Sequence, residues 1–160
     1  MTISFLSDHV DFISILAPEI AAHWQPYLPD ETLEKREAKL RAHMSIDALP
    51  IAWVAHIGGE VLGTAALRIA DLEGREDLMP WLGGVFVRHQ FRRRGVASAL
   101  CRVAEEKAWA LGFDRLFLFT LDHQSLYERL GWSNYEPAVW CGHESEIMVK
   151  RPEAAIHFVL

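Results

Sequence analysis

The chain has few of the features that mark a disulfide-stapled, metal-binding or membrane protein. Its two cysteines, Cys101 and Cys141, lie far apart, and neither belongs to a C-x-x-C pair or a Cys/His cluster. We therefore expect no disulfide framework and no metal site. No apolar stretch approaches the roughly 18 residues of a membrane-spanning helix. The first residues, MTISFLSDHVDF, lack a positive segment and a small-residue cleavage site, so we expect no secretory signal and a reduced, cytoplasmic protein.

Basic residues are in the minority. The 160 residues include 22 acids against 16 Lys and Arg, for a formal net charge of -6. An acidic chain repels the phosphates of nucleic acids and anionic membranes, so we expect neither as a partner. Hydrophobic residues make up 51% of the chain, which suits one globular domain over residues 1–160.

Hydrophobic periodicity predicts an α/β chain. The expected helices are 8–24, 30–44, 95–111 and 125–130, with Asp8, Asp30 and Ser125 as their N-terminal caps and Glu105 on the exposed side of the third. The expected strands are 3–6, 51–57, 61–70, 81–87, 114–121, 138–141 and 145–150. Strands 81–87 and 114–121 flank a helix, so we expect them to pair in parallel through a right-handed crossover.

The segment most indicative of chemistry joins strand 81–87 to the helix that follows. It contains Arg92-Arg93-Arg94-Gly95-Val96-Ala97. A helix start exposes unpaired backbone N–H groups, and small residues such as Gly95 and Ala97 let a phosphate approach them. With three arginines beside them, the pattern predicts capture of a phosphate or pyrophosphate. The alternative is a solvated turn before a helix.

These six residues fit [Q/R]-x-x-G-x-[G/A], the acetyl-CoA pyrophosphate motif of the GNAT N-acetyltransferase superfamily. Further along, Leu126-Tyr127-Glu128-Arg129-Leu130-Gly131-Trp132 is similar to the family's L-Y-x-x-x-G-F, and the order and spacing of elements match over residues 51–150. The resemblance implies an α/β (α+β) fold with a mixed central sheet of six to seven strands and about four helices. It also implies direct transfer of an acetyl group from acetyl-CoA, as cosubstrate, to a primary amine in a ternary complex.

The resemblance assigns the pyrophosphate to backbone amides near the helix start and the pantetheine arm to the end of the preceding strand. The residues expected to contact acetyl-CoA are Val85, Phe86, Val87, Arg92, Arg93, Arg94, Gly95, Val96, Ala97, Ser98, Thr120 and Tyr127. Gly83-Gly84 would tolerate a bulge beside the pantetheine, or else allow close packing. For the 3′-phosphate, Arg88 and Arg93 are candidates, with solvated surface as the alternative for each. Thr120 stands where many relatives carry an Asn.

Tyr127 is the candidate catalytic residue, because in the resembling family a Tyr here donates a proton to the departing thiolate. The alternative is that Tyr127 packs in the core. Many family members also carry a Glu on the strand before the pyrophosphate loop, and here that strand has no carboxylate. The base then remains open among Asp122, His123, His143, Glu144 and a water path. The missing Glu keeps a non-catalytic acyl-CoA sensor open as a second function.

The acceptor is expected to be a small-molecule amine or a peptide N-terminus. Its pocket should be built by the first two helices, their connecting loop, the loop 71–80 and the final strands. The aromatic residues of these segments are Trp24, Tyr27, Trp81, Trp132, Tyr135 and Trp140, and the acids of the loop are Asp71, Glu73, Glu76 and Asp77. These acids either attract a cationic amine or form a solvated loop. The tail 154–160 is a candidate edge strand or dimer contact, which leaves a homodimer open.

Overall fold

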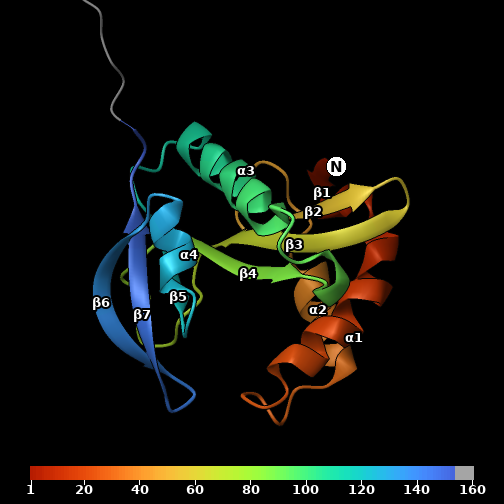
Figure 1. Ribbon diagram of the computed structural model, residues 1–160, viewed down its shortest axis with the longest axis horizontal. Helices are drawn as coiled ribbons and strands as arrows, with labels where there is room; N and C mark the ends of the chain where they lie inside the picture. Colours follow the sequence, from red (N-terminus) through yellow and green to blue (C-terminus); the bar gives the residue numbers. More distant parts are fainter. Residues whose placement is uncertain (154–160) are drawn as a thin grey trace, which may run out of the picture.

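One mixed sheet of seven strands forms the middle layer of the protein, in the order β1-β2-β3-β4-β5-β7-β6 (Figure 1). The computed structural model describes residues 1–153, so the predicted tail element 154–160 lies outside the described residues. The strands are β1 (Thr2–Phe5), β2 (Ile51–Ile57), β3 (Glu60–Arg68), β4 (Trp81–Val87), β5 (Leu116–Thr120), β6 (Ser133–Trp140) and β7 (His143–Lys150). Among these seven strands, β4 and β5 are the one pair that runs parallel. The predicted mixed sheet and its parallel pair are confirmed.

Two helices cover each face of the sheet. On one face, α1 (Ile13–Trp24) and α2 (Leu33–Arg41) bury a cluster that includes Leu16 and Ile20 against β2 and β3. On the other face, α3 (Val96–Ala110) and α4 (Gln124–Arg129) pack on a second cluster (Figure 1). Within residues 1–153, none of the helices combines the length and apolar character needed to cross a bilayer.

The predicted start of each of the first two helices is wrong. Two 3₁₀ turns, Leu6–Asp8 and Val10–Phe12, occupy the stretch where Asp8 was expected to cap a long helix. The second helix is capped by Thr32, whose extended backbone lets its hydroxyl accept the Lys35 amide at 3.2 Å, and not by Asp30. This helix ends at Arg41, and Met44 pairs with β2 as an isolated bridge.

The last part of the chain is more regular than predicted. Strands β6 and β7 extend over eight residues each, since they pair with one another along almost their whole length. Ser125 lies inside α4 and does not cap it, because the helix begins one residue earlier with His123 as its N-cap.

Glu105 also departs from prediction, because it lies in the protein interior and not on the exposed side of α3. Glu105 is 6% exposed, and its carboxylate pairs with the Lys150 ammonium of β7. Burial raises the pKa of Glu105, while Lys150 opposes that shift. The same ammonium donates to the Leu130 carbonyl at 2.6 Å, at the end of α4. Lys150 therefore joins α3, α4 and β7.

We expect Lys150→Met to lower the free energy of unfolding by about 2 kcal/mol, because it leaves a buried carboxylate and a carbonyl without their charged partner. Urea denaturation measures this loss. The matched control is Lys35→Met, since the Lys35 ammonium bonds a backbone carbonyl at the surface; its change should stay within about 0.5 kcal/mol. Equal losses in the two variants would contradict a structural role for the Lys150 contacts.

The sheet opens between β4 and β5. Backbone pairing between the two strands is limited to Trp81 and Phe117. On its other side, β4 pairs with β3 through a bulge. Thr64 faces Phe86 and Ala66 faces Gly83, so one residue of β3 lies opposite two residues of β4. Gly84 has φ +58°, a conformation that a glycine adopts without strain. Both alternatives given for Gly83-Gly84 are present, because the strand bulges there and the Asp71 and Arg68 side chains pack against the two glycines. The β4 edge beyond Trp81 is unpaired toward β5 within the described chain.

Candidate active site

A concave row of backbone amides follows β4. Arg93 and Gly95 have φ angles of 64° and 77°, and Gly95 is the N-cap of α3. Left-handed residues at these alternate positions turn successive N–H groups toward one side, as in an anion-binding nest. The amides of residues 93–95 donate to no acceptor in the described part of the chain. Those of Val96 and Ala97 belong to the first turn of the helix, which has no intrahelical acceptors for them. The loop therefore offers five consecutive amides to an anion.

The arginines around this row are exposed, and two of them are held by neighbours. Arg92 donates from Nε to the Val87 carbonyl at 3.0 Å, and its guanidinium lies 5.9 Å from the centre of the Phe86 ring. Arg94 lies 5.8 Å from the Phe91 ring. Side chains anchored in this way keep their charge near the amides, which makes the loop locally cationic in an acidic chain.

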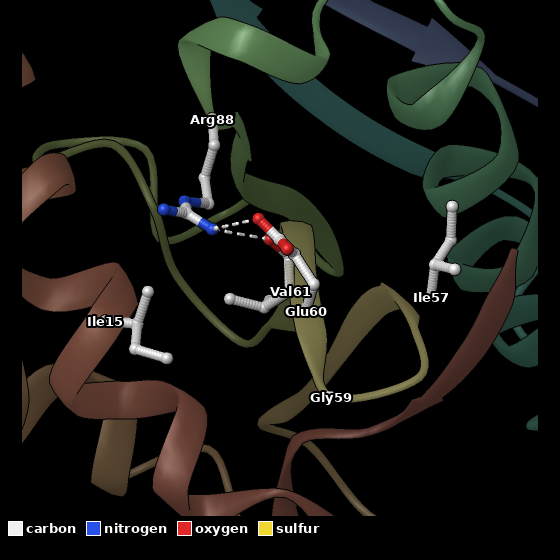
Figure 2. Close-up of a pocket in the computed structure, with 6 residues that line it drawn as sticks. All are labelled: Ile15, Ile57, Gly59, Glu60, Val61 and Arg88. Atoms are coloured by element: carbon white, nitrogen blue, oxygen red, sulfur yellow. Dashed lines mark hydrogen bonds and ion pairs between the residues drawn. The ribbon is translucent and has the colours of Figure 1, made fainter.

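Arg88 is held by contacts with α1 and β3. Its Nε donates to Glu19 of α1 at 2.7 Å, and its Nη1 donates to the Val61 carbonyl at 2.9 Å. Figure 2 shows Arg88 directed at Glu60 and Val61, beside a surface hollow of about 690 Å³. Arg88 thus ties the end of β4 to α1, whereas Arg93, the other candidate for the 3′-phosphate, is exposed and makes no ion pair among residues 1–153.

Tyr127 lies on α4, on the α3 side of the sheet. It is 8% exposed and belongs to the same core cluster as Leu82 and Leu118 of the two diverging strands. Its ring centre is 6.2 Å from that of Trp132. Burial raises the pKa of the Tyr127 phenol, so at neutral pH the group is protonated and can donate a hydrogen bond.

Thr120 ends β5 and is buried. Its hydroxyl oxygen accepts the His123 amide at 3.0 Å, which fixes the turn into α4. The hydroxyl proton is still available, because a hydroxyl has one donor in addition to its acceptor sites. The Thr120 hydroxyl can therefore still donate one hydrogen bond.

The four base candidates lie at the surface. Asp122 and His123 are 3.4 Å apart on exposed side chains. His143 and Glu144 begin β7 and are also exposed, with the His143 ring 4.9 Å from that of Tyr27.

Four of the six predicted acceptor-side aromatics form a connected row on the face of the sheet that carries α1 and α2. Trp140 of β6 lies 5.4 Å from Trp24 and 5.6 Å from Tyr27, between their ring centres, and so links the end of α1 to the β6–β7 hairpin. Through Phe119 the row reaches Trp81 of β4. These elements meet at the end of the sheet opposite the chain's N-terminus (Figure 1).

Of the other two aromatics, Tyr135 extends the row and Trp132 lies apart from it. Tyr135 lies against Phe117, with 5.3 Å between ring centres, and Phe117 lies 5.9 Å from Trp81. Trp132 packs beside Tyr127 in the core cluster on the α3 side. The sequence did not predict that the Trp132 side chain lies on the opposite face from the row.

A cluster that the sequence did not predict as a unit lies over the opening of the sheet. Arg68, at the end of β3, donates from Nε to His43 Nε2 at 2.9 Å and from Nη1 to Asp71 Oδ1 at 2.7 Å. A Cβ atom on Gly83 would lie 2.8 and 2.9 Å from the two Asp71 oxygens. Of the three, sequence reasoning named only Asp71, as one of several loop acids. The signal for the cluster was the Gly83-Gly84 pair, which leaves space for it on β4.

The comparisons with known proteins agree on one family. The sequence model of the Acetyltransferase (GNAT) family matches residues 14–132. The uncharacterized N-acetyltransferase YjgM of Escherichia coli (strain K12) is 34% identical over 96 residues, which cover 57% of this chain and 56% of that protein. The match thus spans little more than half the length of this relative. Since the family model covers most of the chain, the chain belongs to the GNAT acetyltransferase family.

Solved structures share the fold at low sequence identity. The putative acetyltransferase yncA from Salmonella typhimurium, determined with its cofactor acetyl-CoA, has a TM-score of 0.71 and 16% identity, over 100% of this chain and 99% of that one. The aminoglycoside 6′-N-acetyltransferase from Enterococcus faecium has a TM-score of 0.68 and 17% identity, over 97% and 100% of the two chains. At these identities the likeness concerns the fold.

Proposed function

We propose that this protein transfers the acetyl group of acetyl-CoA to a primary amine by direct attack in a ternary complex. The observation that carries the proposal is the row of unpaired amides at residues 93–97, placed next to the unpaired edge of β4. An anion site and a free strand edge in line suit a ligand with a pyrophosphate at one end and an amide-containing arm at the other. Acetyl-CoA has this form.

The arm would lie along β4 like an added strand. The pyrophosphate occupies the amides of residues 93–97, and the pantetheine passes Val87, Phe86 and Val85 toward the bulge. Four residues of strand span about 13 Å, so the arm reaches from the loop to Gly83. The thioester then lies where β4 and β5 diverge. Because the Val87 carbonyl already accepts from Arg92 and Phe86 pairs with Thr64 of β3, the Val85 backbone groups are the better partners for the pantetheine amides.

In the reaction, the amine nitrogen forms a bond to the thioester carbonyl carbon and the carbon–sulfur bond breaks. An acceptor that arrives protonated first releases one proton to solvent, because only the neutral amine attacks. The bonded nitrogen then loses a second proton, and the departing thiolate gains one to leave as CoA thiol. Tyr127 is the protein donor proposed for that thiolate, since its phenol is protonated and lies on the element that follows β5. The same contact stabilises the negative charge that develops on sulfur.

The test of this function combines binding with turnover. We expect CoA and acetyl-CoA to raise the melting temperature, because both bind the folded chain. We also expect thiol release from acetyl-CoA with at least one amine of a panel: n-butylamine, 2-phenylethylamine, spermidine, kanamycin and the tripeptide amide Ala-Tyr-Lys-NH₂. Absence of a thermal shift with CoA would contradict both CoA-based functions.

The second candidate function is an acyl-CoA sensor without turnover. The observation that favours it is the absence of any carboxylate on β4, Trp81–Val87. A sensor would show the thermal shift with both thioester and thiol and no thiol release with any amine of the panel. The two functions are therefore separated by the same pair of measurements.

A further inference from the structure

We infer that Asp71 binds the acceptor's amino group, and that Arg68 and His43 are positioning residues that hold its carboxylate over the opening between β4 and β5. The inference rests on the proposed acetyl transfer and names the acceptor side of that site. It assigns the role of amine recognition to a carboxylate from the β3–β4 loop, because β4 itself supplies none.

The first step is the position of the carboxylate. The Asp71 side chain is 14% exposed and lies on the α1 and α2 side of Gly83, close enough that a Cβ there would approach within 2.8 Å of Oδ2. Backbone pairing between β4 and β5 ends at Trp81, and Gly83 lies two residues further along β4. The carboxylate therefore stands at the point where the two strands diverge and where the thioester is placed.

The second step is the way in which the carboxylate is held. Arg68 binds Oδ1 at 2.7 Å, while no donor within residues 1–153 binds Oδ2. Arg68 is itself fixed, because its Nε donates to His43 Nε2. A guanidinium only donates, so Nε2 accepts and the His43 proton lies on Nδ1, which donates to the Lys39 carbonyl at 2.6 Å. The chain of contacts leaves Oδ2 beside Gly83 without a hydrogen-bond donor among residues 1–153.

The electrostatics of the cluster fit an amine that donates an N–H. Burial lowers the pKa of His43, and the Arg68 charge lowers it further, so this imidazole is neutral at neutral pH. The charges of Arg68 and Asp71 then cancel, so the cluster has no excess charge of either sign. An amine N–H donated to the carboxylate makes a charge-assisted hydrogen bond.

The third step is the relation to the rest of the site. Gly83 pairs with Ala66, whose side chain belongs to the α1 and α2 cluster, whereas Tyr127 belongs to the α3 cluster. Asp71 and Tyr127 therefore approach the opening from opposite faces of the sheet. The aromatic row from Trp81 to Trp140 lies on the Asp71 face, beside the path by which an amine would reach the carboxylate. Such rings favour a cation next to them.

The deciding experiment measures steady-state kinetics with the amine of the panel that has the highest kcat/KM. We expect Asp71→Asn to raise the KM for the amine about 10-fold or more, because a hydrogen bond to a charged group is lost. The KM for acetyl-CoA, the affinity for CoA and the melting temperature should stay close to those of the wild type. The control is Glu73→Gln, which removes the same charge from an exposed position of the same loop and should leave the amine KM within about 2-fold.

Two further variants test the placement itself. Gly83→Ala keeps every charge but puts a Cβ where the carboxylate lies, so it should also raise the amine KM. Arg68→Lys keeps the positive charge and loses the fork that joins His43 to Asp71, and it should raise the amine KM without changing the KM for acetyl-CoA.

Each outcome decides one of the two proposals. Turnover by the wild type with an unchanged amine KM in Asp71→Asn would overturn the role of Asp71 and leave the acetyl transfer intact. An equal rise in the amine KM for Asp71→Asn and Glu73→Gln would overturn it too, since it would show a general effect of loop charge. CoA binding without turnover for any amine would overturn the proposed transfer, and the role of Asp71 with it.

Discussion

Ala97→Asp is expected to weaken acetyl-CoA binding by about 100-fold or more, because it places a carboxylate beside the pyrophosphate, and close like charges at an interface cost several kcal/mol. Ala97 is the second residue of α3, directly after the left-handed turn of Arg93 and Gly95. Its amide is one of the five that face the proposed anion. Isothermal titration with CoA measures the loss.

The same substitution should not weaken the fold. An acidic side chain in the first turn of a helix interacts favourably with the helix dipole, by about 0.3–1 kcal/mol. The melting temperature without ligand is therefore expected to stay the same or to rise, while binding is lost. A lower affinity for CoA with an unchanged or higher melting temperature identifies an effect at the ligand site, since damage to the fold would lower both quantities.

The matched control at this position is Ala97→Asn. It has the size of the aspartate and no charge, so the loss of affinity should be about 10-fold smaller than for Ala97→Asp. If the two variants bound CoA equally weakly, steric exclusion alone would explain the effect. If both bound like the wild type, the anion would lie elsewhere and the proposed position of acetyl-CoA would be wrong.

The loop proposed to bind the pyrophosphate was predictable from sequence because its determinants are local. A strand, small residues at fixed offsets and a long amphipathic helix lie within one stretch of the chain, and Gly95 has the positive φ that the turn requires. The parallel pairing of strands 81–87 and 114–121 followed from the same stretch, since a strand–helix–strand unit joins parallel strands. The structure confirms this parallel pair, whereas the order of the seven strands was not predicted.

The helix starts were less predictable, because several side chains compete for each one. Asp30 and Thr32 both have oxygen atoms that can cap α2, and the structure uses Thr32, whose backbone at φ -108° and ψ 164° has the extended form that a cap requires. Asp8 lost its predicted role in a similar way, to two 3₁₀ turns. Sequence spacing does not contain this conformational information.

The acceptor side of the site could not be predicted, because its members come from distant segments. His43 follows α2, Arg68 ends β3 and Asp71 lies in the next loop. Their meeting depends on the bulge in β4 and on the absence of a side chain at Gly83. The sequence showed the two glycines and the loop acids separately. It also placed Trp132 with Trp140, although the two rings lie on opposite faces of the sheet.

Tyr127→Phe is expected to lower kcat about 100-fold while leaving the affinity for acetyl-CoA within about 2-fold, because it removes the proton donor to the leaving thiolate and keeps the other proposed contacts to acetyl-CoA. Removal of one hydroxyl keeps the ring that packs beside Trp132. The control is Tyr135→Phe, which removes a phenol from an exposed position on β6 and should leave kcat unchanged.

The pH profile of kcat adds a second readout for Tyr127. A phenol donates only while it is protonated, and burial raises the pKa of Tyr127 above its ordinary value. Its proton is then retained as pH rises through about 10, where an exposed tyrosine ionises, so Tyr127 should cause no alkaline fall in kcat below that pH. Stopped-flow measurements with acetyl-CoA and the selected amine, from pH 7 to 10, test this in the wild type. Equal kcat in Tyr127→Phe and wild type over that range would show that the ring only packs, and that water protonates the thiolate.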